Sequence, residues 1–139
     1  MINRELAAEV AACAKQFSVV VIVGPRQSGK TTLAKELFPN YRYVLLEDPD
    51  TRARIAADPR GFLMDIQSAS GVIIDEFQQI PELLSYLQGV VDANPRPGFF
   101  ILTGSQNFLM MAQVSQTLVG RAGILQLLPL SLTEVQPPG

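Results

Sequence analysis

One stretch near the amino end combines the residue types that bind a chain of phosphates. Residues 24–31 read Gly-Pro-Arg-Gln-Ser-Gly-Lys-Thr and match the Walker A pattern G-x-x-x-x-G-K-[ST]. Glycine permits the turn that brings backbone N–H groups around a phosphate, Lys30 supplies a point charge, and Thr31 offers a hydroxyl to Mg²⁺. A helix starting after Gly29 adds the positive end of its dipole beneath the anion. The stretch predicts a phosphate-binding P-loop.

The sequence on either side of the loop supports this interpretation. The apolar run from Ser18 to Val23 precedes it, and the helix-forming segment from Thr32 to Leu37 follows it, as the motif requires. A glycine-containing turn with an exposed lysine is the alternative. We expect the nucleotide to contact the loop and the residue after it: Gly24, Pro25, Arg26, Gln27, Ser28, Gly29, Lys30, Thr31 and Thr32. Within this set, Arg26 is expected at the mouth of the site.

Two carboxylates follow the apolar segment 72–74. A P-loop requires a carboxylate at the end of a neighbouring strand to organise its metal, and Asp75 is placed to hold Mg²⁺ through water. Glu76 is then the predicted general base for the attacking water. In the alternative interpretation, Asp75 caps the next helix and Glu76 is a solvated surface charge.

Small polar residues at 103–107 follow another apolar segment. Ser105 is the first candidate to orient the water or to sense the γ-phosphate, and Thr103, Gln106 and Asn107 are its rivals. Helix capping by Ser105 or Asn107 is the alternative role.

Arg121 follows a glycine and is the candidate for neutralising charge in the transition state. It would act as an arginine finger, either in trans from a neighbouring subunit or in cis. A surface arginine after a turn is the alternative.

Composition excludes several other chemistries. The chain has no histidine and one cysteine, Cys13, which excludes Cys/His zinc sites, a disulfide framework, Ser-His-Asp hydrolysis and Cys-His catalysis. The net charge of −2 gives no signature of direct nucleic-acid binding. Neither a membrane span nor a signal peptide is indicated, so a cytoplasmic location is expected.

The alternation of apolar and helical segments predicts the fold class. At 139 residues and 47% apolar, the chain is expected to form one domain over residues 1–134, with a linker at 135–139 that marks an N-terminal fragment of a longer protein. Strands that are apolar throughout and separated by helices indicate an α/β fold with a parallel sheet covered on both faces. Strands are expected at 18–23, 41–46, 72–74, 99–102 and 123–128, and helices at 3–16, 30–37, 50–57, 61–67, 107–116 and from Pro81.

The sequence resembles the nucleotide-binding domain of AAA-type P-loop ATPases, in a prokaryotic group usually joined to a C-terminal domain of unassigned function. The resemblance rests on the segments 23–33, 46–50, 58–63, 74–78, 102–106, 118–121 and 128–134. It implies a three-layer P-loop NTPase fold with a five-stranded parallel sheet in the order 5-1-4-3-2. It also implies ATP and Mg²⁺ as ligands, with Lys30 on phosphate, Thr31 and Asp75 on metal and Glu76 as base. A homo-oligomer and an attached C-terminal domain are the partners it suggests.

Three functions remain open at this point. The leading hypothesis is an ATPase whose hydrolysis drives conformational change in an attached domain. A nucleotide-gated regulatory or interaction module with little hydrolysis is the second. A small-molecule kinase is the third, and the consecutive acidic pair at 75–76 disfavours it because a kinase does not require the second carboxylate.

Overall fold

The computed structural model of the chain describes residues 4–25, 29–105 and 108–127. The strands are β1 (Val19–Val23), β2 (Arg42–Leu45), β3 (Val72–Asp75), β4 (Phe100–Gly104) and β5 (Ala122–Gln126). The α-helices are α1 (Arg4–Gln16), α2 (Lys30–Leu37), α3 (Pro49–Ala57), α4 (Pro59–Asp65), α5 (Leu83–Ala93) and α6 (Phe108–Thr117). Two short 3₁₀ turns, η1 (Ile66–Ser68) and η2 (Phe77–Gln79), complete the elements.

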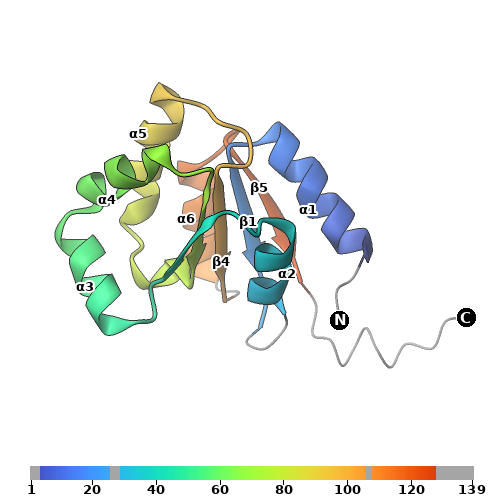
Figure 1. Cartoon of the computed structure of the whole chain (residues 1–139), viewed down its shortest axis with the longest axis horizontal. Helices are drawn as coiled ribbons and strands as arrows, with labels where there is room; N and C mark the ends of the chain where they lie inside the picture. The colour runs from blue at the N-terminus through green and yellow to red at the C-terminus, as the bar shows by residue number, and fades with distance from the viewer. Residues whose placement is uncertain (1–3, 26–28, 106–107, 128–139) are drawn as a thin grey trace, which may run out of the picture.

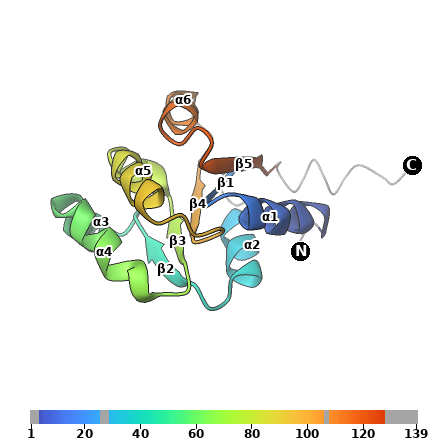
Figure 2. The same cartoon turned by 90° about the horizontal axis from the view of Figure 1, so that it is seen from above.

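The five strands form one parallel sheet in the order β2-β3-β4-β1-β5. Read from the opposite edge, this is the expected order 5-1-4-3-2. Helices α1 and α2 cover one face, and α3 to α6 cover the other, which makes three layers (Figures 1 and 2). The prediction of an α/β fold with a covered parallel sheet is confirmed.

Strand β1 shows why the central strands are apolar throughout. All five of its residues are buried. Val19, Val21 and Val23 pack into the cluster under α3 to α6, whereas Val20 and Ile22 pack under α1 and α2. Because successive side chains point to opposite faces, a strand covered on both sides has no position for a polar residue until it ends.

The same alternation directs the polar residues at the ends of β3 and β4. Ile73 and Ile101 lie in the cluster under α1 and α2. Asp75 and Thr103, two positions later in each strand, therefore face the α2 side, and they are paired in the sheet register. A carboxylate and a hydroxyl are thus brought side by side beneath the helix that follows the P-loop.

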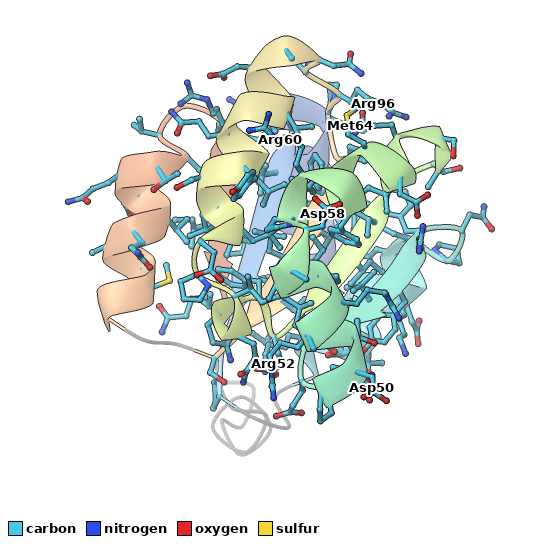
Figure 3. The ribbon with its side chains drawn as sticks, turned by 90° about the vertical axis from the view of Figure 1, so that its left-hand side faces the viewer. Asp50, Arg52, Asp58, Arg60, Met64 and Arg96 are labelled. Atoms are coloured by element: carbon cyan, nitrogen blue, oxygen red, sulfur yellow. The ribbon has the colours of Figure 1, made fainter. Side chains whose placement is uncertain are left out.

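Aspartates begin the two helices that follow β2. The Asp48 carboxylate accepts a hydrogen bond from the backbone N–H of Thr51, and Asp58 accepts one from the N–H of Gly61. Each is followed by proline, which is well suited to the first helical position. Figure 3 shows Asp58 where α3 meets α4 on the face opposite α1 and α2.

The helix expected from Pro81 begins two residues later, at Leu83. The N–H groups of Leu83 and Leu84 bond to the carbonyls of Ile80 and Pro81, three residues earlier. These short i to i+3 bonds continue the tight turn of η2, so the α-helical repeat starts only beyond them.

Within the described residues, every helix is too short or too polar to cross a membrane.

Candidate nucleotide-binding site

Polar residues gather in a cavity of about 290 Å³ at the carboxyl ends of the strands, beside the start of α2. Its lining residues are Gly29, Lys30, Thr31, Thr32, Leu45, Glu47, Asp75 and Glu76. Larger cavities of about 460 and 650 Å³ lie along α3, α4 and α5. Chemistry rather than size identifies the site, because the smallest of these three cavities combines the P-loop lysine with the acidic pair. Ligands of open α/β sheets bind at this edge.

The described part of the P-loop has the geometry that phosphate binding requires. Gly29 has a φ of 90°, a left-handed conformation that glycine adopts readily, and it directly precedes α2. The Lys30 side chain is 5% exposed, and its Nζ donates to the Pro25 carbonyl at 3.3 Å. A buried ammonium with one carbonyl partner among the described residues keeps donors for an anion. Arg26, Gln27 and Ser28, also expected to contact nucleotide, lie outside the described residues.

The Asp75 carboxylate accepts three hydrogen bonds from hydroxyl groups. Thr31 Oγ1 and Tyr43 Oη donate to Oδ2 at 3.0 and 2.5 Å, and Thr103 Oγ1 donates to Oδ1 at 2.7 Å. Asp75 is 5% exposed. Its oxygens therefore face Thr31 and the sheet rather than the N–H groups of the next turn, so the helix-cap alternative is wrong.

Glu76 is buried as well, at 8% exposed. Gln78 Nε2 donates to its Oε1 at 2.5 Å, and Lys30 Nζ lies 3.9 Å from its Oε2. The alternative of a solvated surface charge is therefore wrong. Glu76 lies in the same cavity as Lys30 and Thr31, as the sequence predicted.

The third predicted cluster is only partly described. Thr103 is fully buried on Asp75, and the carbonyl of Gly104 accepts from the N–H of Gly24 at 3.2 Å, which ties the end of β4 to the start of the P-loop. Ser105 follows directly and is half-buried. Its role as sensor stays a prediction, and Gln106 and Asn107 lie outside the described residues.

The structure does not bring Arg121 together with the other site residues. Arg121 precedes β5, and its carbonyl accepts from Val19 N–H at the start of β1, so it lies at the amino edge of the sheet. A strand of five residues, roughly 16 Å long, separates that edge from the site. Its guanidinium forms a double hydrogen bond with Asp92 at 2.5 and 2.9 Å, and this contact lowers the pKa of Asp92. An arginine finger in cis therefore does not fit, and the role in trans stays a prediction.

Sequence reasoning missed Tyr43 and Gln78. Tyr43 pairs with Ile73 in the register of β2 and β3, so its ring lies on the α2 side, where Lys35 Nζ sits 3.9 Å from the ring centroid. Burial and the hydrogen bond to Asp75 raise the pKa of the Tyr43 hydroxyl above its usual range. The alternation of side chains along β2 would have predicted the position of Tyr43 only if the register of β2 against β3 had been known.

The family of this domain follows from comparison with known proteins. The family model for the AAA domain matches residues 16–136, which include every polar residue of the cavity. The chain belongs to the AAA family. This chain, the AAA domain, is therefore of the P-loop ATPase type, and membership of the family supports nucleotide binding.

Two relatives of the AAA domain are uncharacterised mycobacterial proteins, from Mycobacterium tuberculosis and Mycobacterium bovis. Each is 33% identical over 137 residues, which cover 96% of this chain and 30% of the relative. The AAA domain therefore spans about 30% of the length of these curated relatives.

A solved structure of PCH-2 from C. elegans has the same fold. It superposes with a TM-score of 0.54 at 17% identity, over 90% of this chain and 42% of that protein.

Proposed function

We propose that this domain binds MgATP and hydrolyses it, and that the cycle drives conformational change in an attached domain or partner. The observation that carries the proposal is one cavity containing a buried lysine, a hydroxyl bonded to a carboxylate, and a second buried carboxylate. These are Lys30, Thr31 with Asp75, and Glu76. A cation beside two carboxylates suits a metal-bound polyphosphate better than an uncharged ligand.

The donor atoms of the cavity fit Mg²⁺. Thr31 Oγ1 and Asp75 Oδ2 are hard oxygen ligands 3.0 Å apart. Within the described residues, acidic, histidine and cysteine side chains form no cluster of three that would hold a metal by themselves. Mg²⁺ commonly takes one or two protein oxygens and completes its shell with water and substrate phosphates. When bound, it would neutralise charge that develops on the phosphate oxygens.

The remaining residues supply positioning and proton transfer. Lys30 binds the β- and γ-phosphates, and the N-terminus of α2 faces the same anion. Glu76 takes a proton from water while the water oxygen bonds to the γ-phosphorus. The bond from that phosphorus to the bridging oxygen breaks, and ADP leaves with its electron pair. The proton then passes to the released phosphate or to solvent.

The coupling part of the proposal rests on the length of the relatives. Because the chain spans about 30% of them, the remaining length is where an attached C-terminal domain would lie. Residues 135–139 would form the linker after a core at 1–134. A homo-oligomer in which Arg121 of one copy reaches the site of another is the remaining partner proposal, and a cytoplasmic location is the expected setting.

Removal of the Lys30 ammonium tests nucleotide binding. We expect Lys30→Ala to abolish measurable MgATP binding by calorimetry, a loss of at least about 100-fold, because several charge-assisted hydrogen bonds to phosphate disappear together. Lys15→Ala, at the exposed end of α1, is the matched control and should bind as the wild type does. Equal ATP affinity in Lys30→Ala and wild type would contradict the site.

Removal of the Glu76 carboxylate separates hydrolysis from binding. We expect Glu76→Gln to retain ATP affinity and to lose phosphate release by about 10²- to 10⁴-fold, the usual contribution of a general base. Glu82→Gln, on an exposed residue before α5, is the control. ATP binding with wild-type phosphate release no higher than that of Glu76→Gln would favour the nucleotide-gated module instead.

A further inference from the structure

Glu76 has a backbone conformation that needs support from its surroundings. Its φ of 61° and ψ of 50° are left-handed, and it is the one non-glycine residue with positive φ in the described part of the chain. A side chain with a Cβ disfavours this region, so neighbouring contacts must hold it there. Asp75 on one side is fixed by three hydroxyls, and Phe77 on the other is 2% exposed in the core. The reversal at Glu76 lets both neighbours keep these contacts.

The Gln78 amide fixes the Glu76 side chain within this reversal. Gln78 Nε2 donates to Glu76 Oε1 at 2.5 Å. The oxygen of the same amide, Gln78 Oε1, is buried and has no hydrogen-bond partner among the described residues. The reversed amide would place its oxygen against the carboxylate, so the charge of Glu76 selects the observed orientation. The contact of Gln78 Nε2 with Glu76 therefore leaves Gln78 Oε1 buried without a hydrogen-bond partner among the described residues.

The end of β4 is shaped to receive this amide. A Cβ at Gly104 would lie 2.5 Å from Gln78 Oε1 and 2.8 Å from the Phe77 ring. Glycine therefore leaves the space that Gln78 occupies. The carbonyl of Gly104 also accepts from the N–H of Gly24, so the strand end that receives the amide holds the first residue of the P-loop.

The two oxygens of Glu76 have different neighbours. Oε1 is engaged by Gln78, and Oε2 lies 3.9 Å from Lys30 Nζ. Because Lys30 marks the position of the β- and γ-phosphates in the proposed function, Oε2 is the oxygen that faces the reacting phosphate. A donor on Oε1 prevents the carboxylate from rotating and leaves Oε2 to accept the proton of the attacking water.

We propose that Gln78 is a positioning residue, which acts on hydrolysis by holding Glu76 with Oε2 toward the phosphate site. The inference rests on the proposed function, because Glu76 is the base only if the domain hydrolyses ATP. It assigns a role to a residue outside the P-loop and the acidic pair. A structural role for the same amide would instead lower stability and affinity without depending on Glu76.

A double-mutant cycle on the whole chain distinguishes these roles. Single-turnover hydrolysis and ATP affinity are measured for wild type, Gln78→Met, Glu76→Gln and the double variant. We expect Gln78→Met to lower the rate about 10- to 100-fold without changing affinity, since a misplaced catalytic group costs about that much. In the Glu76→Gln background it should have no further effect. Gln79→Met is the matched control, because Gln79 also lies in η2 but its exposed side chain accepts from Arg52 Nη1. Figure 3 shows Arg52 on α3.

Two results would overturn the proposal. One is an unchanged rate in Gln78→Met; the other is an equal loss of rate in the wild-type and Glu76→Gln backgrounds, which would indicate a structural role.

A wild-type chain that binds ATP without releasing phosphate contradicts the proposed hydrolysis, and the contact between Gln78 and Glu76 is then tested by side-chain amide hydrogen exchange. Slow exchange at Gln78 that Glu76→Ala abolishes supports the positioning contact. Exchange as fast as at the exposed Gln113 overturns it.

Discussion

At the scale of single residues, Asp75 connects more of the site than any motif indicates. Its two oxygens join α2 through Thr31, β2 through Tyr43 and β4 through Thr103. A carboxylate that accepts several hydrogen bonds is held in one orientation. The residue expected to organise the metal is therefore positioned by three elements that are distant in the sequence.

Thr103 is the member of this group whose contribution is simplest to measure. Valine has nearly the same shape, so Thr103→Val removes one hydrogen bond from a fully buried position and leaves Asp75 Oδ1 without that donor. We expect the free energy of unfolding, measured in urea, to fall by about 1–3 kcal/mol. Thr117→Val, at the end of α6, is the control and should change stability by much less. A Thr103→Val domain as stable as wild type would show that the bond to Asp75 contributes nothing.

The sequence was informative about residues wherever a motif fixes their chemistry. Lys30, Thr31, Asp75 and Glu76 were predicted together and line one cavity. Gln78 could not be predicted as their partner, because its contact depends on the left-handed turn at Glu76. Local patterns give residue types at a spacing, whereas a contact across a turn depends on dihedral angles that the pattern leaves open.

At the scale of elements, the end of β4 packs against the 3₁₀ turn η2 at Gly104. A methyl group there would lie within 3 Å of Gln78 Oε1 and of two Phe77 ring atoms. We expect Gly104→Ala to cost about 1–3 kcal/mol, because the buried ring cannot move freely. Gly89 in α5 gives the opposite case, since a methyl group there meets open space.

Gly89→Ala is therefore the matched control for Gly104→Ala. It should stabilise the domain by about 0.5–1 kcal/mol, since alanine loses less conformational freedom than glycine in a helix. Both free energies come from denaturant unfolding of the same domain. Equal changes in the two variants would show that close packing at the end of β4 is not what requires glycine.

Element boundaries were predicted best where a specific residue sets them. Asp48-Pro49 and Asp58-Pro59 begin α3 and α4 within two residues of the expected positions. Pro81 was misleading, because proline suits the first position of a helix and also the tight turns that precede α5 here. The choice between these two roles depends on the 3₁₀ turn η2, which no periodic sequence pattern predicts.

At the scale of the whole molecule, apolar strands predicted a sheet covered on both faces but not the order of its strands. Any permutation of five buried strands satisfies the same pattern. The order came from the family resemblance, in which the segments 74–78 and 102–106 add to the P-loop, and the structure confirms it. The order also determines which polar ends meet: β3 and β4 are neighbours, so Asp75 and Thr103 form a pair.

At the opposite end of the sheet, where the strands begin, a hydrogen bond links the segments before β2 and β4, and its contribution to the free energy of unfolding depends on pH. The Tyr41 hydroxyl, just before β2, donates to the carbonyl of Gly98 in the loop before β4 at 2.7 Å. Burial raises the pKa of Tyr41, and nearby Arg96 offsets part of that rise. Above pH ~10 the unfolded chain releases a tyrosine proton that the folded chain still holds, so this contribution to stability is lost as pH rises.

Tyr41→Phe isolates that contribution. At neutral pH we expect it to lower the free energy of unfolding by about 1 kcal/mol, the usual value of one such hydrogen bond. From pH ~10 upward, the gap to wild type should narrow, because only the wild type has this proton to lose on unfolding. Urea unfolding across this range measures the gap, and Tyr86→Phe on the exposed face of α5 serves as the control. A gap that stays constant with pH would show that Tyr41 titrates alike in the folded and unfolded chains.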